Sequence, residues 1–446
     1  MSSWPPSGPD AWEEAQRAYR LVRSISPQFH AVLLALYWTH YNAGIPLVDK
    51  TSFEQSTKNT GELYHCHLLH LSILAMGYHF VDQSSHDVPQ VAATIGESTF
   101  HCEAKLQLWL RLRSPKLSTA TALVILGDLE FQIGNSALGR RFVGIASQIA
   151  LDTSIILSDH TSGGSNQEMW MRRHVVAACS LYDNNWALLG GLSPLVRTLE
   201  MGHREWVARS KEKHTPILPN SVSGLEEQIY VAAAELQNFC ETIIEMRHSI
   251  DTLRNGLSLM GRGDSERVSL NRDMTAWYQG LSPELRWTSN KKDVVPVAFF
   301  LLHQQYNAAM IRLHQSFSCH RSHKTGPVAV APSGTAHLGH LTAISQTVCS
   351  RHAKQIVHML DAQESRFGHA VALLPGLQAA ATAAGALMDA IAQTTEPAQR
   401  EPSSRSLKVL LRILSASAGT CKPAGALADM ILNFLNRSIV PSDNRA

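Results

Sequence analysis

The sequence lacks closely spaced cysteines. Its seven cysteines stand at positions 66, 102, 179, 240, 319, 349 and 421, and no two of them form a C-x-x-C pair. An odd number of widely separated cysteines indicates free thiols in a reducing compartment, because a disulfide framework needs pairs at short, regular spacing. The cysteine pattern therefore argues against a small secreted, disulfide-stapled protein.

A segment able to cross a bilayer is also missing. Residues 370–388 carry no charge, but they are rich in alanine and include Pro375 and Gln378, which favours a buried helix over a membrane span. The first 16 residues lack the basic and apolar regions of a secretory signal. A formal net charge of +2 over 446 residues gives no overall attraction to nucleic acid or to anionic lipid. We expect no membrane partner.

Catalytic motifs are absent as well. The chain contains no G-x-S-x-G elbow, no phosphate-binding loop and no H-E-x-x-H. Residues 261–264 (GRGD) follow no strand, so we interpret them as a turn between helices. The acid pairs Glu13–Glu14 and Glu226–Glu227 are adjacent in sequence, so on helices their side chains diverge. With no nucleophile, base and stabiliser assigned together, we predict no catalytic residues and no enzyme.

The clearest positive pattern lies in residues 118–155, which we expect to form a helical hairpin. Apolar residues recur at offsets 0, 4, 7 and 11 in both halves, which indicates one apolar face per helix. These residues are Ala122, Leu126, Leu129, Ile133, Leu138, Phe142, Ile145 and Ile149. Ser118 or Thr119 is expected to cap the first helix, and Gly134–Asn135 to end it. Small residues at Gly139, Gly144 and Ala146 would allow another helix to approach closely.

Similar periodicity recurs along the chain, and sustained period-two alternation is almost absent. The predicted fold class is all-α, a large multi-helix domain. The other predicted helices are residues 11–24, 29–41, 63–80, 91–112, 168–189, 225–259, 268–281, 296–317, 341–367, 377–393, 407–417 and 424–436. Residues 43–53 are predicted to be a turn, because Pro46 prevents helix continuation. We predict a disordered tail over residues 1–10, a single helical domain over residues 11–440 with a possible subdivision near residues 211–224, and a flexible loop over residues 321–340.

Residues 64–70 (YHCHLLH) are the densest cluster of metal-capable side chains. On a helix His67 and His70 share a face, whereas His65 and Cys66 point elsewhere. Zinc needs three or four converging ligands, and the chain has 22 histidines, so a chance cluster of structural or surface histidines is the preferred interpretation. We therefore assign no metal ligand, no cofactor-binding residue and no cofactor to this chain.

Two further features have an ordinary interpretation that we prefer. The basic pairs Arg140–Arg141, Arg172–Arg173 and Lys291–Lys292 are short and lack interleaved aromatics, so they are interpreted as exposed helix charges rather than a nucleic-acid surface. The aromatic residues Phe299, Phe300, Tyr306 and Phe317 could line a ligand pocket, but a helix that is apolar on several sides is more often simply buried.

Several segments, in conserved order, carry a resemblance to a known family. They are Tyr37…Tyr41…Ile45-Pro46-Leu47-Val48-Asp49-Lys50…Phe53; Leu69 to Gly77; the hairpin with Gly134-Asn135 and Gly144-x-Ala146-x-x-x-Ala150; Arg172-Arg173 and Asp183; Trp277…Leu281-Ser282-Pro283-x-Leu285-x-Trp287; and Leu302-His303-x-x-Tyr306-Asn307-x-Ala309…Leu313-His314-x-x-Phe317. Across residues 30–390 they resemble the middle homology, or regulatory, region of the fungal zinc-cluster transcription factors. The resemblance implies an all-helical regulatory domain in nuclear transcription control, acting as a homodimer or as a heterodimer with a related factor.

This sequence departs from the family pattern in two places. Asn184 stands where the family usually has Arg, and residues 190–192 (GGL) replace the usual G-R-P, which puts the expected Arg-to-Asp contact in doubt. The six-cysteine, two-zinc cluster that places a helix in the DNA major groove is not matched in this chain. By resemblance, zinc and direct DNA contact would belong to a missing N-terminal domain. Alternatively, the protein consists of this regulatory domain alone. It would then act by dimerising with a full-length relative or by serving as a corepressor.

Two other functional hypotheses remain open. A helical protein-interaction scaffold is one, since the hairpin looks like a tetratricopeptide unit, although no 34-residue recurrence is visible. A helical enzyme with an aromatic pocket is the other, and it predicts a titratable cluster in the largest cavity. The leading prediction remains a nuclear regulator of RNA polymerase II transcription that binds an effector, a partner or the transcription machinery and reaches DNA only indirectly.

Overall fold

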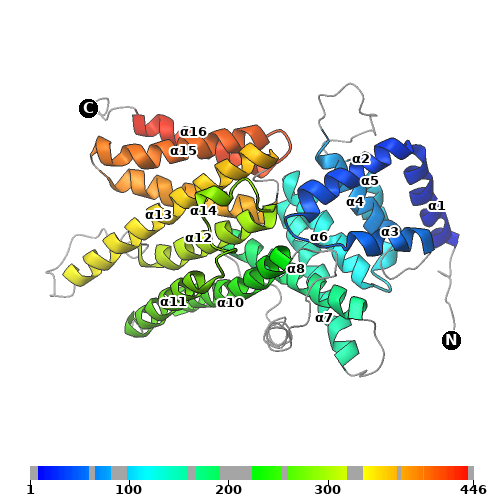
Figure 1. Cartoon of the computed structure of the whole chain (residues 1–446), viewed down its shortest axis with the longest axis horizontal. Coiled ribbons are helices and arrows are strands. Elements are labelled where there is room, and N and C mark those ends of the chain that lie inside the picture. The colour runs from blue at the N-terminus through cyan, green and yellow to red at the C-terminus, as the bar shows by residue number, and fades with distance from the viewer. Residues whose placement is uncertain are drawn as a thin grey trace. The chain divides into compact units, whose positions relative to one another are not determined.

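The computed structural model describes residues 9–59, 66–81, 98–158, 166–190, 224–253, 260–318, 335–368, 373–394 and 396–439. Helices are the only regular elements in these ranges, and no strand occurs there, so the predicted all-α class is confirmed (Figure 1). The chain divides into two compact units. Unit 1 comprises Met1–Asp183 and Leu195–Val222, and unit 2 comprises Asn184–Pro194 and Ser223–Ala446. The boundary predicted near residues 211–224 lies outside the described residues, except that Gly224 begins a helix.

Unit 1 is built around a helical hairpin. Its elements are α1 (Pro9–Ser24), α2 (Pro27–Leu36), the π-helix η1 (Tyr37–Asn42), α3 (Lys50–Asn59), α4 (His67–His79), α5 (Thr99–Arg111), α6 (Leu117–Gln132), α7 (Ser136–Ser158) and the part of α8 (Asn166–Gly190) up to Asp183. Helix α4 packs against α2, α5 and α6, and α6 packs along α7. The hairpin predicted from residues 118–155 is therefore confirmed, and it lies at the centre of this unit.

Close backbone approach explains the small residues of the hairpin. A Cβ on Gly127 of α6 would lie 2.9 Å from the carbonyl oxygen of Gly139 on α7. Gly134 has a φ of +96°, a left-handed conformation that glycine adopts without steric cost, and it ends α6 as predicted. The predicted apolar face of α7 is wrong at Ile145, which is 37% exposed. Val143 faces the interior instead.

Helix α6 is buried along its whole length, so its polar side chains need partners inside the unit. Tyr182 of α8 donates a hydrogen bond to Asp128 across 3.0 Å, and Tyr41 of η1 lies 3.0 Å from the Tyr182 oxygen. Since Tyr182 uses its proton toward Asp128, Tyr41 is the donor to Tyr182. This chain of three groups joins η1, α8 and α6. Burial raises the pKa of both tyrosines well above the ordinary value, so both stay protonated.

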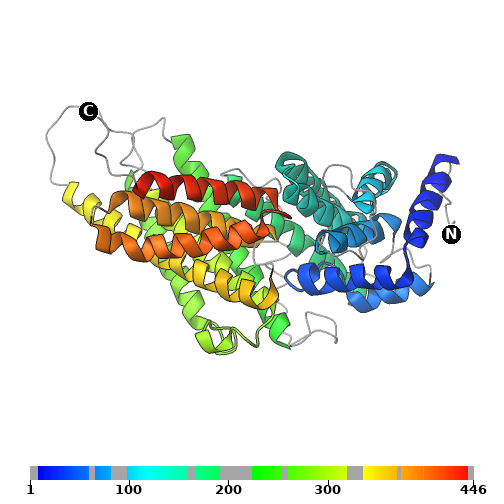
Figure 2. The same ribbon diagram turned by 90° about the horizontal axis from the view of Figure 1, so that it is seen from above.

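Unit 2 is a bundle in which α12 and α13 share the most extensive contact among the described helices. Figure 2 shows its last four helices, coloured yellow to red, side by side. Its elements are the C-terminal part of α8, α10 (Gly224–Leu253), α11 (Met260–Gly280), the 3-10 turn η2 (Ser289–Lys291), α12 (Val297–Ser318), α13 (Thr335–Phe367), α14 (Leu374–Gln393), α15 (Pro397–Ser417) and α16 (Lys422–Ile439). Helix α12 contacts α10, α13 and α14, and α14 contacts α15 and α16. Phe299, Phe300 and Tyr306 lie in its core, as the sequence interpretation predicted, whereas the side chain of Phe317 falls outside the described residues.

Several predicted boundaries are wrong, and each has a local cause. Residues 43–53 were predicted to be a turn, but α3 begins at Lys50, because the Asp49 carboxylate accepts the backbone N–H of Ser52 at 2.8 Å and caps the helix. Helix α6 begins one residue before Ser118, and the Thr119 hydroxyl accepts the Lys116 N–H at 3.2 Å from inside the helix. The N-cap residue is therefore Lys116, and the predicted cap at Ser118 or Thr119 is wrong.

The starts of four further helices, α11, α13, α1 and α15, also differ from the predicted boundaries. Residues 261–264 were predicted to be a turn, but they belong to α11, where two glycines cost about 1 kcal/mol each without breaking the helix. Helix α13 begins at Thr335, inside the loop predicted over residues 321–340, and α1 begins at Pro9, inside the predicted tail over residues 1–10. The rest of both ranges lies outside the described residues. Helix α15 begins at Pro397, ten residues before the predicted start, with proline in the first turn where its missing N–H costs nothing.

Candidate functional site

The predicted histidine cluster does not form a metal site in the part that the structure describes. His65 lies outside the described residues, and Cys66 is buried, with its sulfur accepting the Leu69 N–H at 3.3 Å at the start of α4. The ring of His70 is buried, and its Nε2 lies 2.9 Å from Nε2 of His30 on α2. Burial lowers the pKa of His30 and of His67. No group of three or more His, Cys, Asp or Glu side chains converges among the described residues.

Two of the three basic pairs have described side chains, Arg140–Arg141 in unit 1 and Lys291–Lys292 in unit 2. Arg141 is exposed on α7 and Arg140 is half-buried, while the side chains of Arg172 and Arg173 lie outside the described residues. The ammonium of Lys291 contacts the backbone carbonyls of Pro283, Glu284 and Arg286, and so closes the loop between α11 and α12. This lysine holds a loop rather than presenting a charge.

The family-like segments around Trp277 and His303 meet in unit 2. His303 Nε2 lies 2.8 Å from the carbonyl oxygen of Leu285, and its Nδ1 lies 2.9 Å from the Tyr278 hydroxyl. Trp277 donates its indole N–H to Glu235 of α10 at 2.9 Å, and the rings of Tyr278 and Tyr306 stack with centroids 3.9 Å apart. These contacts fix the loop that follows α11.

That loop positions Trp287. Its ring stacks against Phe299 with centroids 6.0 Å apart and meets the ring of His358 on α13 edge-on at 6.1 Å. Trp287 is half-buried, so one part of its indole remains available at the surface. Through its hydrogen bond to the Leu285 carbonyl, His303 thus fixes the backbone two residues before Trp287.

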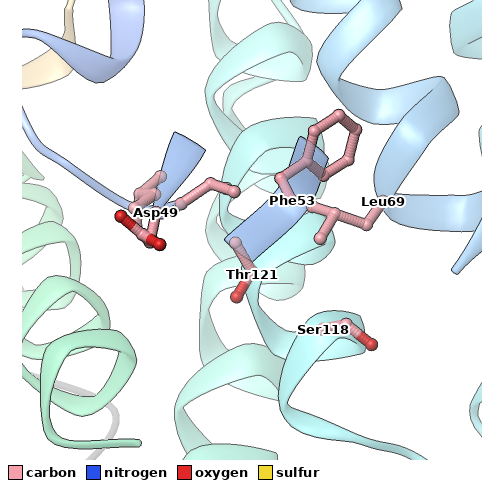
Figure 3. Close-up of a pocket in the computed structure, with 7 residues that line it drawn as sticks. Asp49, Phe53, Leu69, Ser118 and Thr121 are labelled. Atoms are coloured by element: carbon pink, nitrogen blue, oxygen red, sulfur yellow. The ribbon is translucent and has the colours of Figure 1, made fainter. Parts of the chain in front are cut away.

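Figure 3 shows a very small cavity in unit 1, at the family-like segment around Asp49 and Phe53. Leu47, Asp49, Phe53, Leu69 and Thr121 are among the residues around it, and its volume is about 10 Å³. That is room for about one water molecule. We therefore do not assign a ligand to it.

Unit 2 has a much larger open groove, of about 740 Å³, between α13, the end of α14, the start of α15 and Trp287. Helix α13 presents Arg351, Lys354 and His358 to it, α14 presents Gln393, and α15 presents Gln399. The α13 residues are spaced by three and four positions, so they share one face of the helix. Pockets of a few hundred to a thousand Å³ accommodate small organic molecules.

The groove does not contain an activated nucleophile. Thr347 and Thr394 donate their hydroxyls to carbonyls of their own helices, at 3.0 and 2.7 Å. Among its described lining residues, no serine or threonine is hydrogen-bonded to a histidine or a carboxylate. The arrangement can bind and orient a molecule, but it contains no pair of nucleophile and base.

The opposite side of α13 forms a buried polar interface with α12. His352 Nδ1 donates to Asn307 Oδ1 across 2.6 Å, and Asn307 donates to the His303 carbonyl at 2.7 Å. Burial, with a smaller contribution from the positive charge of the neighbouring Arg351, lowers the pKa of His352 to about 3. Burial likewise lowers the pKa of His314 to about 4, again with a contribution from Arg351. Arg351 of α13 therefore lines the groove and also lowers the pKa of the two buried histidines.

Asn184, which stands where the resemblance led us to expect arginine, has its own partners. Its amide donates to Gln237 Oε1 and to Glu241 Oε1 on α10, both at 3.2 Å. An asparagine is short enough to make these bonds inside the unit, where it is only 2% exposed. The expected arginine contact is thus replaced by a contact with α10.

The profile of the fungal specific transcription factor domain matches residues 34–310. The match covers more than half of the chain, and the chain belongs to this family of transcription regulators. No curated protein and no solved structure matches it. Among the described residues, no helix is both long and apolar enough to span a membrane.

Proposed function

We propose that this chain controls RNA polymerase II transcription in the nucleus as the regulatory domain of a zinc-cluster-type regulator. It would act as a homodimer, or as a heterodimer with a related factor, and respond to an effector or to the transcription machinery. The observation that carries the proposal is the family match over residues 34–310, which takes in the hairpin of unit 1 and α12 of unit 2. The groove on α13 supports the effector part of the proposal.

In this proposal the chain reaches DNA indirectly. Zinc and base contacts would be supplied by a zinc cluster outside residues 1–446, or by the cluster of a dimer partner. Within unit 2, the ammonium of Lys291 binds carbonyls of its own loop rather than presenting its charge, which supports an indirect route to DNA.

A fusion experiment tests the proposal. Residues 1–446 would be fused to a bacterial DNA-binding domain that occupies its operator only as a dimer, and expressed in fungal cells with a reporter that also carries constitutive activator sites. The DNA-binding domain alone, and the same domain fused to an inert obligate dimer, are the controls. Operator occupancy is measured by chromatin immunoprecipitation and transcription by reporter RNA.

We expect the fusion to occupy the operator at least five times more than the DNA-binding domain alone. We also expect it to raise or lower reporter RNA relative to the inert dimer. Occupancy no higher than that of the domain alone would rule out self-association. Reporter RNA equal to the inert-dimer control would rule out transcription control.

A further inference from the structure

The groove of unit 2 has an uneven distribution of charge. Among the described residues that line it, the ionisable ones are Arg351, Lys354 and His358, and none is a carboxylate. Among the described residues, neither Arg351 nor Lys354 forms an ion pair, since the salt bridges of unit 2 involve other side chains. Two cations with no counter-charge in a concave surface produce a positive potential that attracts an anion.

The nearby acids are oriented toward other groups. Glu396 accepts a hydrogen bond from Gln399 at 2.9 Å, and Asp361 pairs with Arg412. Asp389 is next in sequence to the lining residue Ala390, but its side chain is exposed and is not among the described residues that line the groove. None of these carboxylates therefore neutralises the centre of the groove.

The remaining lining groups suit a compact organic molecule. Side-chain amides such as Gln393 offer both donors and acceptors, and the half-buried indole of Trp287 provides a flat apolar surface at one side. Arg351 and Lys354 are three residues apart on one helical face, so both can reach one carboxylate or phosphate group. A volume of about 740 Å³ is suited to a small molecule.

We infer that this groove binds a small organic anion, with its carboxylate or phosphate group at Arg351 and Lys354 and its apolar or aromatic part against Trp287. The inference rests on the proposed function, for which this anion is the effector. The charge is confined to two neighbouring residues rather than extended as a stripe, which favours a small ligand over a nucleic-acid backbone.

Ligand-observed NMR on the full chain tests the inference. The probes are phenyl phosphate, benzoate and inorganic phosphate, with phenol and benzyl alcohol as uncharged counterparts. The groove variant is Arg351→Gln with Lys354→Gln. The matched control is Arg405→Gln with Lys408→Gln, which removes two positive charges with the same spacing from an exposed part of α15 outside the groove. Thermal unfolding of each variant shows whether it is folded.

We expect saturable binding of phenyl phosphate or benzoate at one site per chain, and binding at least ten times weaker for the uncharged counterparts. The groove variant should bind the anions at least ten times more weakly than the wild-type chain does. The control variant should bind them less than two times more weakly. Inorganic phosphate should bind more weakly than phenyl phosphate, because it does not contact Trp287. The comparison of charged and uncharged probes needs only the wild-type chain, so it holds even if the variant fails to fold.

Equal binding of charged and uncharged probes, an absence of saturable binding, or equal losses in both variants would each overturn the inference. Binding of an aspartate- and glutamate-rich peptide at Arg351 and Lys354 in place of the small anions would also overturn it, since the occupant would be a protein segment. Failure of these experiments leaves the reporter result of the proposed function intact. Failure of the reporter alone would leave an anion site without a role in transcription.

Discussion

The Tyr278 hydroxyl and Nδ1 of His303 lie 2.9 Å apart, and the direction of their hydrogen bond is fixed by the other side of the ring. Nε2 of His303 lies 2.8 Å from the carbonyl oxygen of Leu285, which can only accept, so Nε2 carries the proton. Nδ1 of the neutral ring is then the acceptor, and Tyr278 donates. Burial lowers the pKa of His303 to about 4, which agrees with a neutral ring that connects α11, α12 and the loop bearing Trp287.

Replacing Tyr278 with Phe removes the donor and leaves Nδ1 of His303 buried without a partner. The ring stack on Tyr306 is preserved, so the loss should come from the hydrogen bond alone. We expect the free energy of unfolding to fall by about 1–2 kcal/mol, measured by urea denaturation. Tyr19→Phe on the exposed side of α1 is the control and should change the stability by less than about 0.5 kcal/mol. Equal effects of the two substitutions would contradict the assigned bond.

Acid should destabilise the chain through its buried histidines. Burial lowers the pKa of His303 and His314 to about 4 and that of His352 to about 3, below their ordinary value of 6.5. Between pH 6.5 and 4 the unfolded chain binds more protons than the folded chain, so stability is full above pH 6.5 and falls as the pH drops. We expect a loss of about 1–2 kcal/mol per histidine between pH 7 and pH 5.

Urea denaturation at pH 7, 6 and 5 measures this dependence. His352→Gln keeps a donor near Asn307 but cannot titrate, so its loss of stability between pH 7 and 5 should be smaller by about 1–2 kcal/mol. Glu130 does not contribute in this window, since its pKa is lowered to about 2 and its effect begins only below pH 4.5. Stability that is constant or rises toward pH 5 would show that the three rings are not held neutral.

Gly77→Ala tests the close contact between α4 and α2. A Cβ at Gly77 would lie 2.2 Å from the backbone carbonyl oxygen of Leu33, so one helix backbone has to move. We expect a loss of about 2–3 kcal/mol despite alanine's better helix propensity. Gly385→Ala in α14 is the matched control, because its nearest neighbour lies 4.0 Å away. That substitution should stabilise by about 0.5–1 kcal/mol. A change in the unfolding temperature that has the same sign in both variants would refute the packing argument.

Glu130→Gln tests the buried ion pairs of α6. Its carboxylate lies 2.9 Å from the Lys105 ammonium and 3.1 Å from His101 Nε2, and it is fully buried. Removing the negative charge takes away the buried carboxylate that the Lys105 ammonium contacts, which should cost about 3–5 kcal/mol. Glu54→Gln, on the exposed pair with Lys50, should cost less than about 1 kcal/mol. Chemical denaturation compares the two, and similar losses would contradict a buried ion pair.

Much of the helical fold was predictable because its signals are local. The apolar spacing of residues 118–155 and the left-handed preference of Gly134 define the hairpin without reference to any other segment. Helix α3 was missed because its residues 50–59 are mostly polar, and its start depends on one carboxylate, that of Asp49. Residues 261–264 contain two glycines, so propensity indicated a turn, whereas the structure places them at the start of α11.

The groove was not predictable, since its residues are far apart in sequence. Trp287, Arg351, Gln393 and Gln399 meet only after α13, α14 and α15 pack together. The family-like segments did identify His303 and Trp287, although their spacing gave no indication that one positions the other. The sequence signal that remained unused was the spacing of Arg351, Lys354 and His358, which places all three on one face of α13.

The π-helix η1 constrains how this chain can change in length. It directly continues α2, where Leu33 packs on Gly77, and it ends near Tyr41, which bonds to Tyr182. Each residue of a helix turns the chain by about 100°, so losing or gaining one residue between Leu33 and Tyr41 would turn one of these anchors away from its partner. Substitutions in this segment are limited by burial, but insertions and deletions are limited by rotation. Relatives that retain both anchors should therefore align here without a gap, even where their side chains differ.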